Sequence, residues 1–205
     1  MGIITITAEL KRAFEEANID FIAIRSATAE EFYDAIGKAK NVNPFGPFVT
    51  QHTVEEYRQM RLFLTLDGTA GIAITSENNI VSVFNGGSKR GVLKTLLPVA
   101  IEQGGVKLDN YSSGRLSDMY AAYGFVPISK VKFNRDFAPS DWDYQRDGEP
   151  DVVFWIHNGD SAPDVVLNFG KYSVDWDDIK EFDTYEKAEI FRDELLKFIN
   201  AMEEA

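Results

Sequence analysis

The segment at residues 80–125 limits the possible folds of this chain more than any other part of the sequence. It reads as an apolar strand, a glycine-rich basic turn, an amphipathic helix, a second strand and a second helix. This alternation is typical of α/β proteins, in which helices cover the faces of a sheet. Where a strand leads through a glycine-rich turn into a helix, the free N–H groups of the first helical turn point at an anion, usually a phosphate. The turn at residues 88–91 therefore predicts a phosphate-binding loop.

Three short apolar runs before and into this segment predict an antiparallel meander. The runs at 62–66, 70–75 and 80–84 are separated by polar turns at 67–68 and 77–79. Strands joined by turns this short pair with their direct neighbours. We therefore expect three neighbouring antiparallel strands, the last of which leads into the glycine-rich turn.

Two capping boxes mark the starts of helices. Thr28 is followed three residues later by Glu31, and Thr53 is followed by Glu56. In a capping box each side chain hydrogen-bonds the other residue's backbone N–H, which would otherwise lack a partner. We expect a helix to begin at each box, the first of them directly after a strand at 21–25.

The element order predicts an α/β (α+β) fold with a mixed, mostly antiparallel central sheet flanked by helices. Further elements are expected as strands at 2–7, 126–133, 152–156 and 165–169, and as helices at 8–17 and 184–202. We expect one main domain at 1–158, with its core at 21–156. The remaining residues, 159–205, form a strand-plus-helix extension that either packs on the core or makes a dimer.

The composition excludes several classes of protein. With 205 residues, 44% of them apolar, the chain can bury a sizeable core. Its 21 basic and 33 acidic residues give a net charge of −12, which disfavours binding to nucleic acid. This acidity indicates either a solvated surface or one that attracts basic proteins. The absence of cysteine, of a long apolar run and of an apolar N-terminal stretch predicts a cytoplasmic protein without a membrane partner.

Over residues 21–156 the sequence resembles the GNAT superfamily, the acetyl-CoA-dependent N-acetyltransferases. The resemblance is carried by IAIRSATAEEF, GIAITSENNIVSVF, SKRGVLKTLL and MYAAYGF, and the central hairpin and the FAPSDWDY loop are also similar to GNAT-like proteins of bacteriophages and prophages. It implies an acyl-CoA-binding fold, acetyl-CoA as co-substrate and direct attack of an acceptor amine on the thioester. The acceptor would be a small molecule or a protein.

The resemblance assigns the glycine-rich turn to the pyrophosphate of CoA. The family's loop has Gln or Arg, then Gly, then Gly or Ala, where this chain has Ser88, Gly91 and Leu93. Only Gly91 matches, and the branched side chain of Leu93 would restrict the approach of the pantetheine arm.

Four further residues complete the predicted cofactor contacts. Lys89 and Arg90 would supply cationic contacts to the phosphates, with Phe84 before the turn and Val92 after it. An ordinary strand-to-helix turn with a solvated basic pair is the alternative interpretation.

The same resemblance indicates Tyr120 as a general acid, because the family has a tyrosine four residues before a Gly-Phe pair. A buried aromatic residue is the alternative role. The family's base is often a Glu on the strand before the loop, but residues 80–85 contain no carboxylate. Asp109, on the next strand, is the preferred base, with Glu77 as a second candidate; Asp109 could instead cap the following turn. Ser113 replaces the family's asparagine at the start of the next helix.

A loop at 135–151 is acidic and aromatic. Its residues Asp141, Trp142, Asp143 and Tyr144 could clamp a cationic acceptor, or Trp142 could simply anchor a solvated loop. His52 and His157 lie too far apart in the sequence to suggest a metal site, so none is expected.

Two hypotheses follow from the sequence. The chain is either an acetyl-CoA-dependent N-acyltransferase, or a GNAT-like phage or prophage protein without transfer activity that binds partners through its acidic surface. A homodimer is compatible with both.

Overall fold

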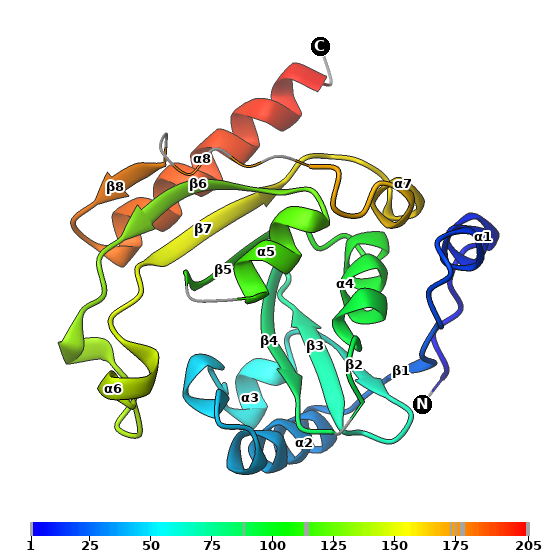
Figure 1. Cartoon of the computed structure of the whole chain (residues 1–205), viewed down its shortest axis with the longest axis horizontal. Coiled ribbons are helices and arrows are strands. Elements are labelled where there is room, and N and C mark those ends of the chain that lie inside the picture. The colour runs from blue at the N-terminus through cyan, green and yellow to red at the C-terminus, as the bar shows by residue number, and fades with distance from the viewer. Residues whose placement is uncertain are drawn as a thin grey trace. The chain divides into compact units, whose positions relative to one another are not determined.

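The computed structural model describes residues 2–87, 89–112, 115–172, 174, 176 and 179–203. Its elements group into two compact units, whose helices and strands are drawn in Figure 1. The first unit contains Met1–Val106 and Gly159–Phe169, and the second contains Lys107–Asn158 and Gly170–Ala205. Each unit is therefore built from two separate pieces of the chain, and residues beyond the expected boundary at 158 are shared between both.

The strands of the first unit follow one another in the order of the sequence. They are β1 (Ile24–Ser26), β2 (Arg61–Thr65), β3 (Ala70–Ile74) and β4 (Asn79–Asn85), each antiparallel to the next. The tight turns between β2, β3 and β4 use left-handed backbone at Gly68 and Asn78, residue types that tolerate a positive φ. The predicted meander is confirmed.

The first unit contains helices as well as strands. They are α1 (Ala8–Glu16), α2 (Ala29–Val42), the short 3₁₀ helix η1 (Gly46–Phe48), α3 (Val54–Tyr57), α4 (Leu93–Glu102) and α7 (Ala162–Leu167). Of these, α2 and α4 pack on the strands, while α1 packs on α7. Both predicted capping boxes are formed, at the starts of α2 and α3. The ring of Phe32 on α2 contacts Tyr57 at 4.9 Å and Phe84 at 5.4 Å between centroids, so α2, α3 and β4 share one core.

Two predictions about strands in this unit are wrong. The segment at 2–7 forms only an isolated bridge between Ile3 and Arg25, and Thr7 caps α1 instead. The segment at 165–169 is largely helical, as the end of α7. Ser161 accepts a hydrogen bond from the backbone N–H of Asp164, and Pro163 lies in the first turn. These helix-start signals outweigh the β-branched valines that suggested a strand.

In the second unit a buried strand lies between two antiparallel neighbours. The strand β7 (Val152–His157) pairs with β5 (Lys107–Tyr111) and with β6 (Phe125–Val131), while the short β8 (Lys180–Phe182) runs parallel to β6. The side chains of β7 are buried almost throughout, as its continuous apolar sequence predicted. The expected mixed, mostly antiparallel α/β architecture is confirmed.

The helices of the second unit are α5 (Arg115–Ala122), the 3₁₀ helix η2 (Arg135–Phe137), α6 (Tyr144–Asp147) and α8 (Tyr185–Glu203). The helix α8 packs on β6 and β7, and Figure 1 shows its C-terminal end extending past these strands. Ala188 and Arg192, one turn apart, are its fully buried residues among those described. The C-terminal extension thus contributes directly to the core of this unit.

No helix within the described ranges combines the length and the apolar character that crossing a bilayer requires.

Candidate functional site

The strand β4, which leads to the predicted phosphate loop, contains a β-bulge. Gly71 pairs with Phe84 and Ala73 pairs with Val81, so β4 has one more residue than β3 between these pairs. Within the bulge Ser82 has φ +51, a left-handed conformation that is unusual for a residue other than glycine.

The hydroxyl of Ser82 fixes this conformation. Its Oγ donates to the carbonyl oxygen of Thr50 at 2.9 Å and lies 2.9 Å from the Tyr57 hydroxyl. Both partners are distant in sequence, and burial leaves the Ser82 side chain no water to bond instead. Sequence reasoning missed this residue, since a single Ser in an apolar strand gives no signal of a bulge.

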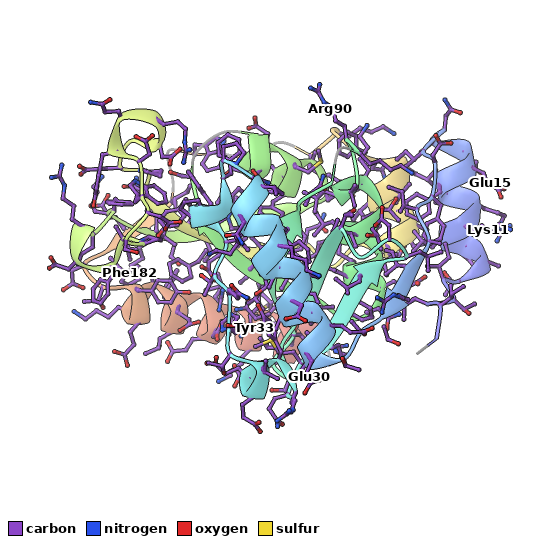
Figure 2. All side chains as sticks on the ribbon, turned by 90° about the horizontal axis from the view of Figure 1, so that it is seen from below. Lys11, Glu15, Glu30, Tyr33, Arg90 and Phe182 are labelled. Atoms are coloured by element: carbon purple, nitrogen blue, oxygen red, sulfur yellow. The ribbon has the colours of Figure 1, made fainter. Side chains whose placement is uncertain are left out.

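The glycine-rich turn after β4 is held by Asn85. Its Oδ1 accepts from the backbone N–H of Gly87 at 3.0 Å, and its Nδ2 donates to the carbonyl oxygen of Lys89 at 3.0 Å. Gly91 follows with φ +78, a backbone conformation that L side chains rarely adopt. Lys89 and Arg90 are exposed, and Figure 2 shows Arg90 pointing away from the ribbon. Ser88 lies outside the described residues.

The helix α4 begins directly after this turn. Val92 is its N-cap residue, in helical conformation, and among the described residues no side chain caps this end by a hydrogen bond. Val92 is buried and Leu93 half-buried, so both side chains turn at least partly inward. In the first turn the N–H groups of Lys94 and Thr95 donate to the carbonyl oxygens of Gly91 and Val92, at 2.9 Å and 3.0 Å. The helix dipole and the exposed Lys89 and Arg90 make this end of the helix electropositive.

The predicted catalytic residues belong to the second unit. Asp109 on β5 lies opposite Phe154 on β7, and residues paired across strands share one face of a sheet. The ring of Phe154 contacts Tyr185 of α8 at 4.7 Å. Asp109 therefore lies on the face that α8 covers. Burial raises the pKa of its carboxyl, against the lowering effect of the Arg192 charge.

Tyr120 lies on α5, among aromatic residues. Its ring is 6.0 Å from Phe125 and 6.3 Å from Trp155, and its side chain is buried. Burial raises the pKa of its phenol, so the hydroxyl stays protonated at neutral pH. Trp155 pairs with Leu108, the neighbour of Asp109, so Tyr120 approaches from the opposite face of β5 and β7.

The predicted site residues are thus divided between the units. Phe84, Lys89, Arg90, Gly91 and Val92 lie in the first unit, and Asp109 and Tyr120 lie in the second. Glu77, the second candidate base, is exposed in the turn between β3 and β4. Ser113, which the resemblance placed at the start of the next helix, lies outside the described residues.

The acidic loop holds itself in place through its own polar groups. Trp142 is buried, contacts Tyr111 at 4.8 Å and donates from Nε1 to the carbonyl oxygen of Gly148 at 3.0 Å. Asp143 caps α6, and the guanidinium of Arg135 lies 5.0 Å from the ring centroid of Tyr144. These contacts engage Trp142, Asp143 and one face of Tyr144 inside the loop, while Asp141 is exposed.

The two histidines occupy separate environments. The Nδ1 atom of His52 lies 3.9 Å from Glu56, and the ring of His157 packs on Phe125 at 5.0 Å. Within the parts of the chain that the structure describes, His, Asp and Glu side chains form no group of three or more that could hold a metal ion.

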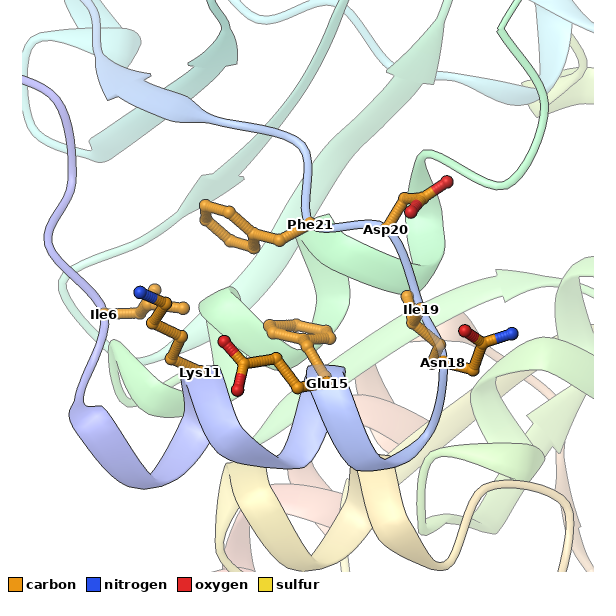
Figure 3. Close-up of a pocket in the computed structure, with 8 residues that line it drawn as sticks. Ile6, Lys11, Glu15, Asn18, Ile19, Asp20 and Phe21 are labelled. Atoms are coloured by element: carbon orange, nitrogen blue, oxygen red, sulfur yellow. The ribbon is translucent and has the colours of Figure 1, made fainter.

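A pocket on the first unit lies beside α1 (Figure 3). It shares no residue with the predicted site, and it is lined by Ile6, Lys11, Phe14, Glu15, Asn18, Ile19, Asp20 and Phe21. Its apolar lining comes from Ile6, Phe14, Ile19 and Phe21, and its charged lining from Lys11, Glu15 and Asp20. The pocket gives no support to either function predicted from the sequence.

The chain has a distant structural likeness to a solved protein structure. No family model matches the sequence, and no curated protein matches it. The crystal structure of ribosomal-protein-S5-alanine acetyltransferase from Vibrio fischeri aligns with a TM-score of 0.45 and 11% identity, over 69% of this chain and 96% of that one. A likeness this distant establishes neither a common fold nor a common reaction.

Proposed function

We propose that the protein is an acetyl-CoA-dependent N-acyltransferase that acts on an amine of a small molecule or a protein. The observation that carries the proposal is the start of α4. This helix opens behind an exposed basic turn, and no described side chain caps its N-terminus. Such an end attracts phosphate groups through the helix dipole and the neighbouring cationic side chains. The resemblance of the sequence to the GNAT superfamily adds support.

The residues of the turn fit an anionic ligand of this kind. Lys89 and Arg90 extend into solvent and would pair with phosphate oxygens. A Cβ atom at Gly91 would meet nothing closer than 4.0 Å, so the backbone there is accessible. Val92 and Leu93 are at least half-buried, and their inward placement reduces the restriction expected from Leu93. The turn would bind the pyrophosphate or the 3′-phosphate of CoA.

Transfer requires one base and one acid. In this mechanism Asp109 takes a proton from the acceptor ammonium, and the free amine attacks the thioester carbonyl carbon. A C–N bond forms, the C–S bond breaks, and Tyr120 protonates the departing thiolate. The nitrogen and the sulfur are bonded to the same carbon in the tetrahedral intermediate, so the mechanism requires the side chains of Asp109 and Tyr120 to reach substituents of one carbon atom. The raised pKa of Asp109 suits a base, since it brings the carboxyl closer to neutral pH.

A transfer assay tests the mechanism. Release of the CoA thiol would be followed with acetyl-CoA and a panel of primary amines and lysine peptides. We expect Tyr120→Phe to lower kcat by about 10²- to 10⁴-fold, the usual contribution of a general acid. Tyr33→Phe, at a half-exposed tyrosine of α2, is the matched control and should leave turnover unchanged. Equal turnover of the Tyr120→Phe variant and the unmodified protein would remove Tyr120 from the mechanism.

A second function, binding without transfer, is favoured by different features. The net charge of −12 would attract basic proteins. In addition, β4 contains no carboxylate, whereas many members of the GNAT superfamily use a Glu on this strand as the base. This hypothesis predicts no binding of acetyl-CoA and salt-sensitive binding of basic partners. Both are measurable on the same purified protein.

A further inference from the structure

The C-terminal helix α8 brings polar groups to the predicted base. Asp109 and Phe154 form a cross-strand pair on the face that α8 covers. The ring of Phe154 contacts Tyr185 at 4.7 Å, and the guanidinium of Arg192 lies 5.5 Å from its centroid. Two residues of α8, separated by two helical turns, therefore lie around Asp109.

Of these two residues, Arg192 is the one held firmly. Arg192 is fully buried, its Nη1 atom donates to the carbonyl oxygen of Leu108 at 3.3 Å, and its Nε atom donates to Asp193 at 2.8 Å. The second oxygen of Asp193 accepts from Nζ of Lys107 at 2.8 Å. Because Leu108 and Lys107 directly precede Asp109, α8 is fixed to the same stretch of β5 that carries the predicted base.

The hydroxyl of Tyr185 completes the contact. Burial raises the pKa of the Asp109 carboxyl, and hydrogen bonding with the Tyr185 hydroxyl acts in the opposite direction, lowering the pKa and favouring the ionised carboxylate. The ring of Tyr185 is stacked edge to face with Phe154 on one side, and 45% of the side chain is exposed. A carboxylate held through one oxygen presents the other in a defined direction.

We propose that Tyr185 is a positioning residue for Asp109, so that the C-terminal helix forms part of the reaction centre. This rests on the proposed function, in which Asp109 is the base. Tyr185 lies outside the stretch that resembles a known family, and nothing in the sequence links it to Asp109. Within the described ranges, the other titratable or charged groups around Asp109 are Glu189 and Arg192 on α8, Tyr120 on α5, and Tyr111 on β5.

The direct test is a titration of the Asp109 carboxyl by ¹³C NMR in the full chain. Tyr185→Phe keeps the ring contact with Phe154 but removes the hydroxyl, so the titration midpoint of Asp109 should move upward. Glu189→Gln removes a neighbouring negative charge and should move the midpoint downward. Tyr33→Phe, in the other unit, should move nothing. An unchanged midpoint in Tyr185→Phe would overturn the proposal, whatever the midpoint in Glu189→Gln.

The pH profile of transfer separates positioning from simple stabilisation of α8. We expect the acidic limb of kcat/KM to move upward in Tyr185→Phe, with an unchanged KM for acetyl-CoA. An acidic limb identical to that of the unmodified protein would overturn the positioning role, even if the NMR midpoint moves. If the unmodified protein does not transfer an acetyl group, the proposed function fails. The NMR titration still decides whether Tyr185 changes the titration midpoint of Asp109.

Discussion

At the scale of single residues, Asp109 makes the free energy of unfolding depend on pH. Burial raises the pKa of its carboxyl in the folded protein, so the native state binds this proton more tightly than the unfolded chain does. The stabilisation from this group is fully present below the unfolded pKa of about 3.9 and is lost as pH rises through the native pKa. Above that pH a partly desolvated negative charge remains in the second unit.

Asp109→Asn should remove this dependence. Because the amide has almost the same shape but no charge, we expect the variant to be more stable than the unmodified protein at pH 7. The difference should shrink as pH falls towards 4, where Asp109 becomes protonated. Urea unfolding between pH 4 and pH 7 measures it. A constant difference across this range would contradict the raised pKa of Asp109.

Other residues of the candidate site differ in how far sequence could predict them. Gly91 was predictable, because a basic glycine turn before a helix is a local pattern. Ser82 was not, since its left-handed conformation depends on Thr50 and Tyr57, 32 and 25 residues away. Tyr185 was hidden for the same reason, because its partner Asp109 lies on a distant strand.

At the scale of elements, α8 is fixed to its unit by an unusual buried charge. The Arg192 side chain is fully buried, with Asp193 and Glu189 as ionic partners and Phe154 beneath it. Removing one member of a buried ion network leaves its partners desolvated and unpaired. Arg192 therefore contributes strongly to the position of α8, beside the packing of Ala188 and the Lys107–Asp193 pair.

Arg192→Met should destabilise the protein by about 3–5 kcal/mol. Its control is Arg12→Met, which breaks the exposed pair with Glu9 on α1 and should cost less than about 1 kcal/mol. Chemical denaturation followed by tryptophan fluorescence gives the value for Arg192→Met, since Trp155 lies on β7 in the same unit as α8. Far-UV circular dichroism, which reports the helices of both units, gives the value for the control. Similar small losses in both variants would show that Arg192 does not anchor the helix.

Helices and strands could be predicted from the sequence where residues close together in the chain determine them. The capping boxes at Thr28 and Thr53 were predictable because partners three residues apart decide them. The meander was predictable from apolar runs separated by turn residues. The supposed strand at 165–169 failed because the helix start at Ser161 and Pro163 lies before the segment whose β-branched residues were considered.

At the scale of the whole molecule, the net charge of −12 works against the proposed ligand. An anionic cofactor is repelled by most of such a surface, so its affinity must come from local contacts. The proposal places these contacts at the turn before α4. Removing two positive charges at this turn should therefore weaken the binding of acetyl-CoA more than removing two positive charges elsewhere on the chain.

Calorimetric titration with acetyl-CoA tests this central claim most directly. The unmodified protein should bind, and the double variant Lys89→Ala with Arg90→Ala should bind at least about tenfold more weakly, a loss of about 1.4 kcal/mol. The control changes Lys11 and Arg12 to Ala, an exposed basic pair on α1 with the same change of charge, and should keep the original affinity. No detectable binding by the unmodified protein, or equal weakening in both double variants, would contradict the account.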